Sequence, residues 1–409
     1  MTFNRTALAA VLAFGAASFA VPAAAQQAQA DAAPKITVSA GARKPIMELQ
    51  QAVNAKDVAN IPARLAAANA AAKTKEDRYF IAQLQLKAAV EANNEAAKAQ
   101  AIDAILASGG APADMMSKLR ISQGQLKYNA KDYAGASAAL EPLVAAEPNN
   151  PDALALLADV RNRQGRAADA LALFQKAAAA KAAAGQPVPK DWAKRAVALA
   201  YNNKLPSAGQ LALDWVKSDP SPTNWRDAIQ IYSDTNQIAA ADRIDVYRLQ
   251  RAASALKGES DFYTYASGVS SKGLPGEAKA VLDEGFASQA INRTSPTFRD
   301  LYASVSGKVA ADKAALPAAE RSALAGSAAR PAMVTGDAYL GYGDYAKAAA
   351  LYRAALGKSG VDANLANLRL GIALARSGDK AGATAAFNAV NDSRASVAKL
   401  WTAWLNSRA

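Results

Sequence analysis

The sequence predicts an all-α protein, a superhelical solenoid of antiparallel helix pairs. A pattern of small and large residues recurs at a spacing of 34 or 35 residues in two parts of the chain, which is the length of a unit of two helices and their turns. The apolar content is 51%, and its dominant residue, alanine, favours helices and their close packing. At 409 residues the chain is long enough for a few compact domains or for one stack of such units.

The first clear copies of the pattern lie within residues 120–180. Four positions recur 34 residues later, namely Gly124, Ala136, Leu143 and Pro148, which become Ala158, Ala170, Ala177 and Ala182. Small residues at the contact positions let two helices approach closely, and we expect Leu140 and Phe174 to fill the space that remains. Pro151 suits the first turn of a helix, and Gly165 suits the left-handed conformation that ends one.

The pattern returns near the C-terminus. Gly336 recurs 35 residues later as Gly371, and Gly343 recurs as Gly378. Asp344 and Asp379 directly follow the turn glycines and suit the N-caps of the second helices. Spacing, residue size and turn chemistry therefore agree in both blocks.

These four units resemble the tetratricopeptide repeat, in which helix–turn–helix units stack into a right-handed superhelix. The resemblance implies a scaffold that is not an enzyme and uses no cofactor. Its concave face, lined by the first helix of each pair, would hold an extended peptide or a helix. Some members clamp a C-terminal carboxylate with Lys, Asn and Arg. Ile121, Ala155, Leu368 and Ile372 stand where such a clamp needs polar groups, which argues against that subtype.

The resemblance also indicates which residues point into the groove. In the first clear unit they are Lys118, Ile121, Gln125, Tyr128 and Asn129. The next unit adds Asp152, Ala155, Asp159, Asn162 and Arg163. The C-terminal units contribute Met333, Asp337, Leu340, Leu368, Ile372 and Arg376.

The N-terminus has the pattern of a secretory signal peptide. Arg5 precedes an apolar run, Ala7–Val21, and Ala23–Ala25 supply small residues for cleavage near Ala25. An uncleaved membrane anchor is the alternative, but the run is short for a span of ~20 residues. We therefore expect an exported, periplasmic protein. The predicted segments are the signal peptide (1–25), a disordered mature N-terminus (26–45), degenerate helical hairpins (46–110), clear repeats (114–182), divergent helical repeats (190–330), clear repeats (331–392) and a C-terminal capping helix (393–409).

Two parts of the divergent region depart from the repeat pattern. Residues 225–234 and 239–255 read as another helix pair. In residues 296–325 the consensus fails, and we expect a longer helix or an insertion there. At the C-terminus, Leu400, Trp401, Trp404 and Leu405 form an apolar stripe. We interpret it as the face of a helix that covers the last repeat, because the end of a solenoid needs a cap.

Several kinds of chemistry are excluded or disfavoured. The chain has no histidine and no cysteine, which removes the commonest general base and metal ligand and all thiol chemistry. Gly341–Ala346 matches a dinucleotide fingerprint but joins two repeat helices instead of following a strand. Ser396–Lys399 matches one motif of penicillin-binding enzymes without its partner motifs. Basic residues do not alternate with aromatic ones, so nucleic-acid binding is not indicated.

The net charge of +12 leaves +11 after loss of Arg5 with the signal, which favours either attraction to anionic envelope surfaces or simply lysine-rich solvated helices. The function we expect is a scaffold that binds a protein or peptide partner, in assembly or maintenance of the cell envelope. The alternative is direct binding of an envelope polymer, peptidoglycan or lipopolysaccharide, through groove aromatics such as Tyr128, Tyr339 and Tyr342.

Overall fold

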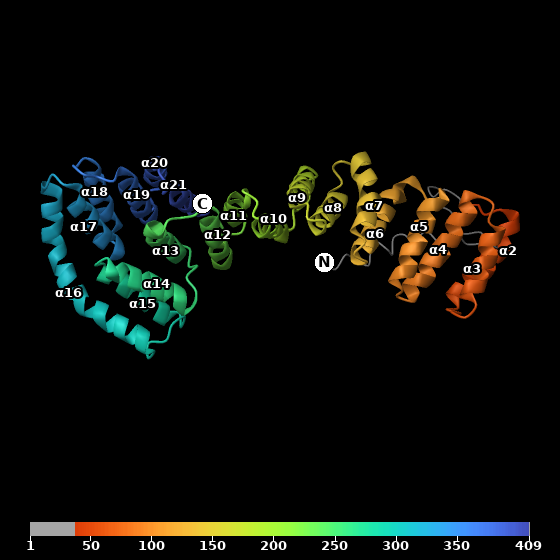
Figure 1. The fold of residues 1–409 in the computed structure, drawn as a ribbon, viewed down its shortest axis with the longest axis horizontal. Helices are drawn as coiled ribbons and strands as arrows, with labels where there is room; N and C mark the ends of the chain where they lie inside the picture. The colour runs from red at the N-terminus through yellow and green to blue at the C-terminus, as the bar shows by residue number, and fades with distance from the viewer. Residues whose placement is uncertain (1–36, 409) are drawn as a thin grey trace, which may run out of the picture. The chain divides into compact units, whose positions relative to one another are not determined.

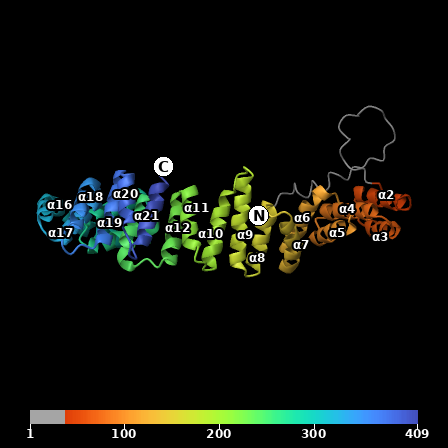
Figure 2. The same cartoon turned by 90° about the horizontal axis from the view of Figure 1, so that it is seen from above.

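Helices make up nearly all the regular structure of the computed structural model, which describes residues 37–408 (Figures 1 and 2). The chain divides into two units, one ending at Val188 and the other beginning at Pro189. In both units, most helices pack on the helix that precedes or follows them in the sequence. The prediction of an all-α helical repeat solenoid is therefore confirmed. The predicted signal peptide lies outside the described residues.

The first unit is a stack of four hairpins over its described residues, 37–188. Each hairpin packs on the next one along the chain, as Figure 2 shows. The helices are α2 (Ala40–Asn54) with α3 (Ile61–Ala71), α4 (Lys75–Glu91) with α5 (Glu95–Ser108), α6 (Met116–Asn129) with α7 (Tyr133–Ala146), and α8 (Pro151–Arg163) with α9 (Ala167–Ala183); a 3-10 turn, η2 (Ala113–Met115), precedes α6.

The start of α2 corrects a predicted boundary. The sequence predicts a disordered mature N-terminus over residues 26–45. The helix instead begins at Ala40 and contains Pro45. Ala42 is fully buried with Ile46 and Leu49 in one apolar cluster, and this packing stabilises the extra turn.

The second unit contains three successive helices at its start, three hairpins, one very long helix and two further single helices. Its elements over the described residues are α10 (Lys190–Asn202), α11 (Ala208–Ser218), α12 (Pro222–Thr235), η3 (Ala240–Asp242), α13 (Arg243–Ala252), α14 (Gly258–Ser271), α15 (Pro275–Ala287), α16 (Pro296–Ala325), α17 (Ala329–Gly341), α18 (Tyr345–Leu356), α19 (Ala363–Ser377), α20 (Lys380–Asn388) and α21 (Ala395–Asn406). The pairs α14/α15, α17/α18 and α19/α20 are the hairpins. The longer helix expected in residues 296–325 is α16, which has 30 residues.

Helix α13 is not the second helix of a pair, contrary to the sequence prediction for residues 225–255. It contacts α12 far less than the two helices of each hairpin contact each other. Figure 1 shows α13 between the C-terminal helices α19–α21 and the hairpin α14/α15, and α13 packs on both α14 and α21. The helix therefore lies inside the second unit, among repeats that are distant in sequence.

The close contacts predicted within hairpins are present. In three hairpins a glycine of the first helix faces a large side chain of the second: Gly124 faces Leu140, Gly336 faces Tyr352, and Gly371 faces Phe387. A Cβ atom at Gly124 would lie 2.7 Å from Leu140 Cγ, and one at Gly336 would lie 2.8 Å from Tyr352 Cε1. Both distances are shorter than atoms can tolerate, so the spacing between the helices depends on glycine.

The turns also follow the predicted chemistry. Gly165, Gly343 and Gly378 adopt the left-handed conformation, with φ between 76° and 90°. Asp344 and Asp379 cap the helices that follow by accepting hydrogen bonds from the backbone N–H groups of Lys347 and Gly382. Each cap supplies a partner for an N–H group that the helix itself leaves unpaired.

Replacing Gly371 tests the assigned register. Gly371→Leu would force a side chain into the Phe387 ring and should lower the free energy of unfolding by ~1–3 kcal/mol. All five tryptophans lie at or after Trp192, so tryptophan fluorescence during urea unfolding follows the second unit alone. The matched control is Gly307→Leu, because a Cβ atom at Gly307 in α16 meets nothing within 4 Å. Equal stability of the two variants would contradict the assigned packing.

Candidate partner-binding surfaces

The ends of α6 and α8 bring together two of the predicted groove residues. Arg163 Nε donates a hydrogen bond to the Tyr128 hydroxyl at 3.2 Å, and the Tyr128 ring lies 5.7 Å from the ring of Tyr133. The hydrogen bond to Tyr128 raises the pKa of Arg163, so the guanidinium stays charged. Arg163 is exposed and Tyr128 is half-buried. The predicted contact between adjacent repeats is therefore present, at the turn ends of the two first helices.

The other predicted residues of the first unit differ in their accessibility. Gln125 Nε2 donates to Asn129 Oδ1 at 2.8 Å, and Asn129, Asn162 and Lys118 are exposed. Asp152 is exposed, and its Oδ1 atom lies 3.8 Å from Lys181 Nζ. Ile121 and Asp159 are half-buried, and Ala155 is buried. The exposed part of this surface is thus polar, with Arg163 and Tyr128 at one end of it.

In the second unit, four of the six predicted groove residues are buried, which corrects the prediction that they line an open groove. They are Met333, Leu340, Leu368 and Ile372. All four belong to one apolar core that also contains Val246 and Leu249 of α13 and Trp401 of α21. Other helices of the same chain contribute to this core, so these positions are not open to a partner.

The two polar residues of that set are engaged with neighbours. Arg376 Nη2 donates to the Tyr345 hydroxyl at 2.9 Å and lies over the same ring. Asp337 accepts hydrogen bonds from Arg369 Nη1 at 2.6 Å and from the Tyr352 hydroxyl at 2.7 Å. Asp337 is therefore part of a structural network inside the unit.

That network is centred on Arg248 of α13, which sequence reasoning did not single out. Arg248 donates two hydrogen bonds to the Glu277 carboxylate, at 2.8 and 2.7 Å, and a third to Asp245 Oδ1 at 2.7 Å. The Tyr265 hydroxyl donates to Glu277 at 2.7 Å. Asp245 also accepts from Arg369 Nε at 3.4 Å. The side chains of Arg248, Glu277 and Asp245 are at most 5% exposed, so each of these charges depends on its partner.

The electrostatics of the three buried acids differ. Burial disfavours ionisation of all of them, but Arg369 and Arg248 hold the pKa of Asp245 below its ordinary value. Arg248 does the same for Glu277. For Asp337, burial outweighs the nearby guanidinium groups and raises the pKa. Three carboxyls share two guanidinium groups here, and Asp337 is the acid whose ionised form folding favours least.

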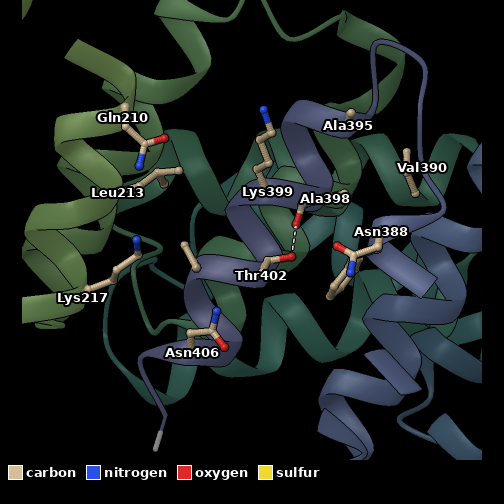
Figure 3. Close-up of a pocket in the computed structure, with 12 residues that line it drawn as sticks. Gln210, Leu213, Lys217, Asn388, Val390, Ala395, Ala398, Lys399, Thr402 and Asn406 are labelled. Carbon is tan, nitrogen blue, oxygen red and sulfur yellow. Dashed lines mark hydrogen bonds between the residues drawn. The ribbon is translucent and has the colours of Figure 1, made fainter. Parts of the chain in front are cut away.

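A surface pocket lies on the same unit, where the start and the end of the unit meet. Its volume is ≈ 440 Å³. Figure 3 shows α21 between α11 and α20 there, with polar side chains around the opening. Lys217 and Lys399 are the charged lining residues; Lys217 pairs with Asp214 at 2.8 Å. The pocket is polar at its rim and is flanked by small apolar residues such as Ala398 and Ala403.

Comparison with known proteins supports the repeat assignment. Residues 121–187 and 333–396 match the tetratricopeptide repeat family. These two segments are thus similar to tetratricopeptide repeats. A search of curated proteins found no match. The described residues include no helix with the length and apolar character needed to cross a membrane, and no cluster of potential metal ligands was found among residues 37–408.

Two solved structures show the level of similarity outside the family match. A tetratricopeptide repeat protein from Parabacteroides merdae is 11% identical, with 73% of this chain and 99% of that chain covered and a TM-score of 0.29. The structure of Naa15/Naa10 bound to HypK-THB is 15% identical, with 85% of this chain covered and a TM-score of 0.34. The present chain spans 62% of the length of that second chain. The repeat assignment rests on the family match and on the observed hairpins.

The charge balance of the buried network predicts unequal effects of two conservative substitutions. Asp245→Asn removes an acid that folding keeps ionised and should cost ~3–5 kcal/mol, because it breaks buried ion pairs. Asp337→Asn leaves two acids with two guanidinium groups, and a raised pKa means that folding already favours the neutral carboxyl. Its cost should be lower by at least ~1 kcal/mol.

Urea unfolding followed by tryptophan fluorescence measures both costs in the second unit. Asp300→Asn, on an exposed position of α16, serves as the control for loss of a carboxylate as such. A larger destabilisation by Asp337→Asn than by Asp245→Asn would contradict the assigned charge distribution.

Proposed function

We propose that this chain is a non-enzymatic scaffold that binds a protein or peptide partner through the α6–α8 surface of its first unit. We define this surface by Lys118, Gln125, Tyr128, Asn129, Asn162 and Arg163. Support comes from the tetratricopeptide repeats in residues 121–187, because stacked helix pairs present extended surfaces for other chains. We place the binding site on this surface because of the contact between Arg163 and Tyr128.

The chemistry of the α6–α8 surface suits recognition of a peptide. Tyrosine and arginine contribute strongly to the affinity of protein interfaces, and here they hold each other in place. A partner that reaches the exposed Arg163 guanidinium with a carboxylate or a backbone carbonyl would meet the edge of the Tyr128 ring next to it. The flanking amides of Gln125, Asn129 and Asn162 can pair with a peptide backbone.

The contrast between the units supports the choice of the first one. The equivalent apolar positions of the C-terminal repeats, such as Leu368 and Ile372, are buried against other helices of the chain. A partner of those repeats would have to displace part of the protein. The α6–α8 surface requires no such displacement.

The proposed place of action is the cell envelope, after export. It rests on the signal-like sequence, with Arg5 before the apolar run Ala7–Val21. The proposed role in envelope assembly or maintenance follows from that location and from the excess of basic residues. N-terminal sequencing of the mature protein from an envelope fraction tests the proposal, and a start near Gln26 is the expected result.

In-cell photocrosslinking tests the binding surface. A photoreactive residue at Asn129, an exposed position beside Tyr128, should capture a defined partner. Tyr128→Ala combined with Arg163→Ala should reduce that capture at least tenfold, which corresponds to ~1.4 kcal/mol. The helical circular-dichroism signal should stay unchanged, because Arg163 is exposed and Tyr128 lies at the end of its helix.

The control is Lys176 on α9, a cationic and exposed position on a second helix. A photoreactive residue there should not capture the same partner, and Lys176→Ala should leave capture at Asn129 unchanged. Equal losses from Lys176→Ala and from the double substitution would indicate diffuse attraction by positive charge, and the α6–α8 surface would then not be the binding site.

A further inference from the structure

Helix α13 and the turn before it form an ion pair at every third residue. The four positions are Asp242, Asp245, Arg248 and Arg251. Their partners are, in the same order, Arg394 at 3.1 Å, Arg369 at 3.4 Å, Glu277 at 2.7 Å and Glu284 at 2.7 Å. Both acids precede both arginines, so α13 has a negative start and a positive end.

This order complements both the helix and its surroundings. Acids near the start and bases near the end of a helix oppose its macrodipole favourably. The surrounding repeats present the reverse order, with arginines from α19 and the start of α21 and glutamates from α15. These arginines and glutamates therefore favour a helix with this order of charges, and they favour only one of its two possible directions.

The partners of α13 are far away in the sequence. They are separated from it by between 29 and 152 residues. The Trp401 indole N–H also donates to the backbone carbonyl of Asp245 at 3.0 Å. These bonds attach α13 to helices that follow it in the chain, and Figure 1 shows α13 beside α14 and near α19–α21, with α12 on its other side.

Helix α12, which precedes α13, shares an apolar core with it, because Ile229 and Tyr232 belong to the same cluster as Val246 and Leu249. A cavity of ≈ 140 Å³ lies between the two helices. Ser233 Oγ and Gln250 Oε1, which belong to residues lining this cavity, are buried without a hydrogen-bond partner in the described structure. The ion pairs of α13 with other helices, by contrast, lead to α15, to α19 and to the start of α21.

Apolar contacts complete the recognition. Val246 and Leu249 belong to the core that contains the C-terminal repeats, while Ile244 belongs to the separate core of α14, α15 and the start of α16. The helix is therefore clamped between two apolar surfaces, and the ion pairs fix its direction and register. A ligand needs both features to take its place.

We propose that the concave side of the C-terminal repeats is a helix-binding site, that α13 is its resident occupant, and that a partner helix with two acids followed by two arginines at three-residue spacing competes for it. The site is separate from the α6–α8 surface and uses none of its residues. The two proposals can therefore fail independently.

A peptide in trans tests this site directly. The probe is a labelled peptide of residues 239–256, and its receptor is the full chain carrying Asp245→Ala and Arg248→Ala, which weakens the resident helix but keeps Glu277 and Arg369. This variant should bind the peptide at least about a hundredfold more tightly than the parent chain does, because a tethered competitor acts at an effective concentration of ~mM.

The control peptide has the same composition and net charge but the opposite polarity, with Asp242→Arg, Asp245→Arg, Arg248→Asp and Arg251→Asp. It should bind at least about tenfold more weakly, since each of its charges would meet its own sign. Equal binding of both peptides, or no binding by a variant that retains its helical circular-dichroism signal, would overturn the proposal.

Loss of the folded second unit in the variant would also overturn the proposal, because α13 would then be an inseparable part of the core. Native-state hydrogen exchange on the parent chain gives an independent result. Amides of α13 should exchange faster than those of α17 and α19, as expected of an element that opens by itself. Exchange of all three helices at one common slow rate would contradict a separable occupant.

Discussion

The arrangement of helices in the second unit depends on a set of buried ion pairs, because a charged side chain removed from water needs a partner of opposite charge. Taking a charged side chain out of water costs several kcal/mol unless partners compensate for it. Asp245, Arg248 and Glu277 are at most 5% exposed at the side chain, and their partners come from three different helices. Arg248 joins α13 to α15 through Glu277, and Arg369 of α19 joins α13 through Asp245, so the three helices are fixed relative to one another. Contacts of Gly336 with Tyr352 and of Gly371 with Phe387 then set the spacing within two hairpins of this unit.

The same repeat thus produces two kinds of surface in one chain. In both units, the first helix of a hairpin packs on the second helix. Its remaining face contacts either solvent or another part of the same unit. In the first unit the turn ends of that face remain exposed and carry Tyr128 and Arg163. In the second unit the face is apolar at Leu368 and Ile372 and is buried beside α13. One fold therefore supplies an accessible surface and an occupied one, which separates the two binding roles proposed for the chain.

Local patterns predicted much of this structure, because the features concerned lie within one repeat. The contact between Gly371 and Phe387 lies within one hairpin, and so does the turn formed by Gly378 and Asp379. The short spacing of these residues in the sequence was therefore enough to predict them. The role of α13 could not be predicted in this way, because its charged residues resemble those of a solvated helix and its ion-pair partners lie up to 152 residues away. The order Asp242, Asp245, Arg248, Arg251 was the available signal. Periodicity also could not show that the face containing Leu368 is covered.

The most direct test of this account is a double-mutant cycle between Arg248 and Glu277, read from urea unfolding by tryptophan fluorescence. The single variants are Arg248→Met and Glu277→Gln, and the cycle compares their summed costs with that of the double variant. If the pair holds α13 in the second unit, the coupling energy should be ~1–3 kcal/mol, because each single variant leaves a buried charge without its main partner. A coupling energy below ~0.5 kcal/mol, the range of independent sites, would contradict the central role assigned to this ion pair.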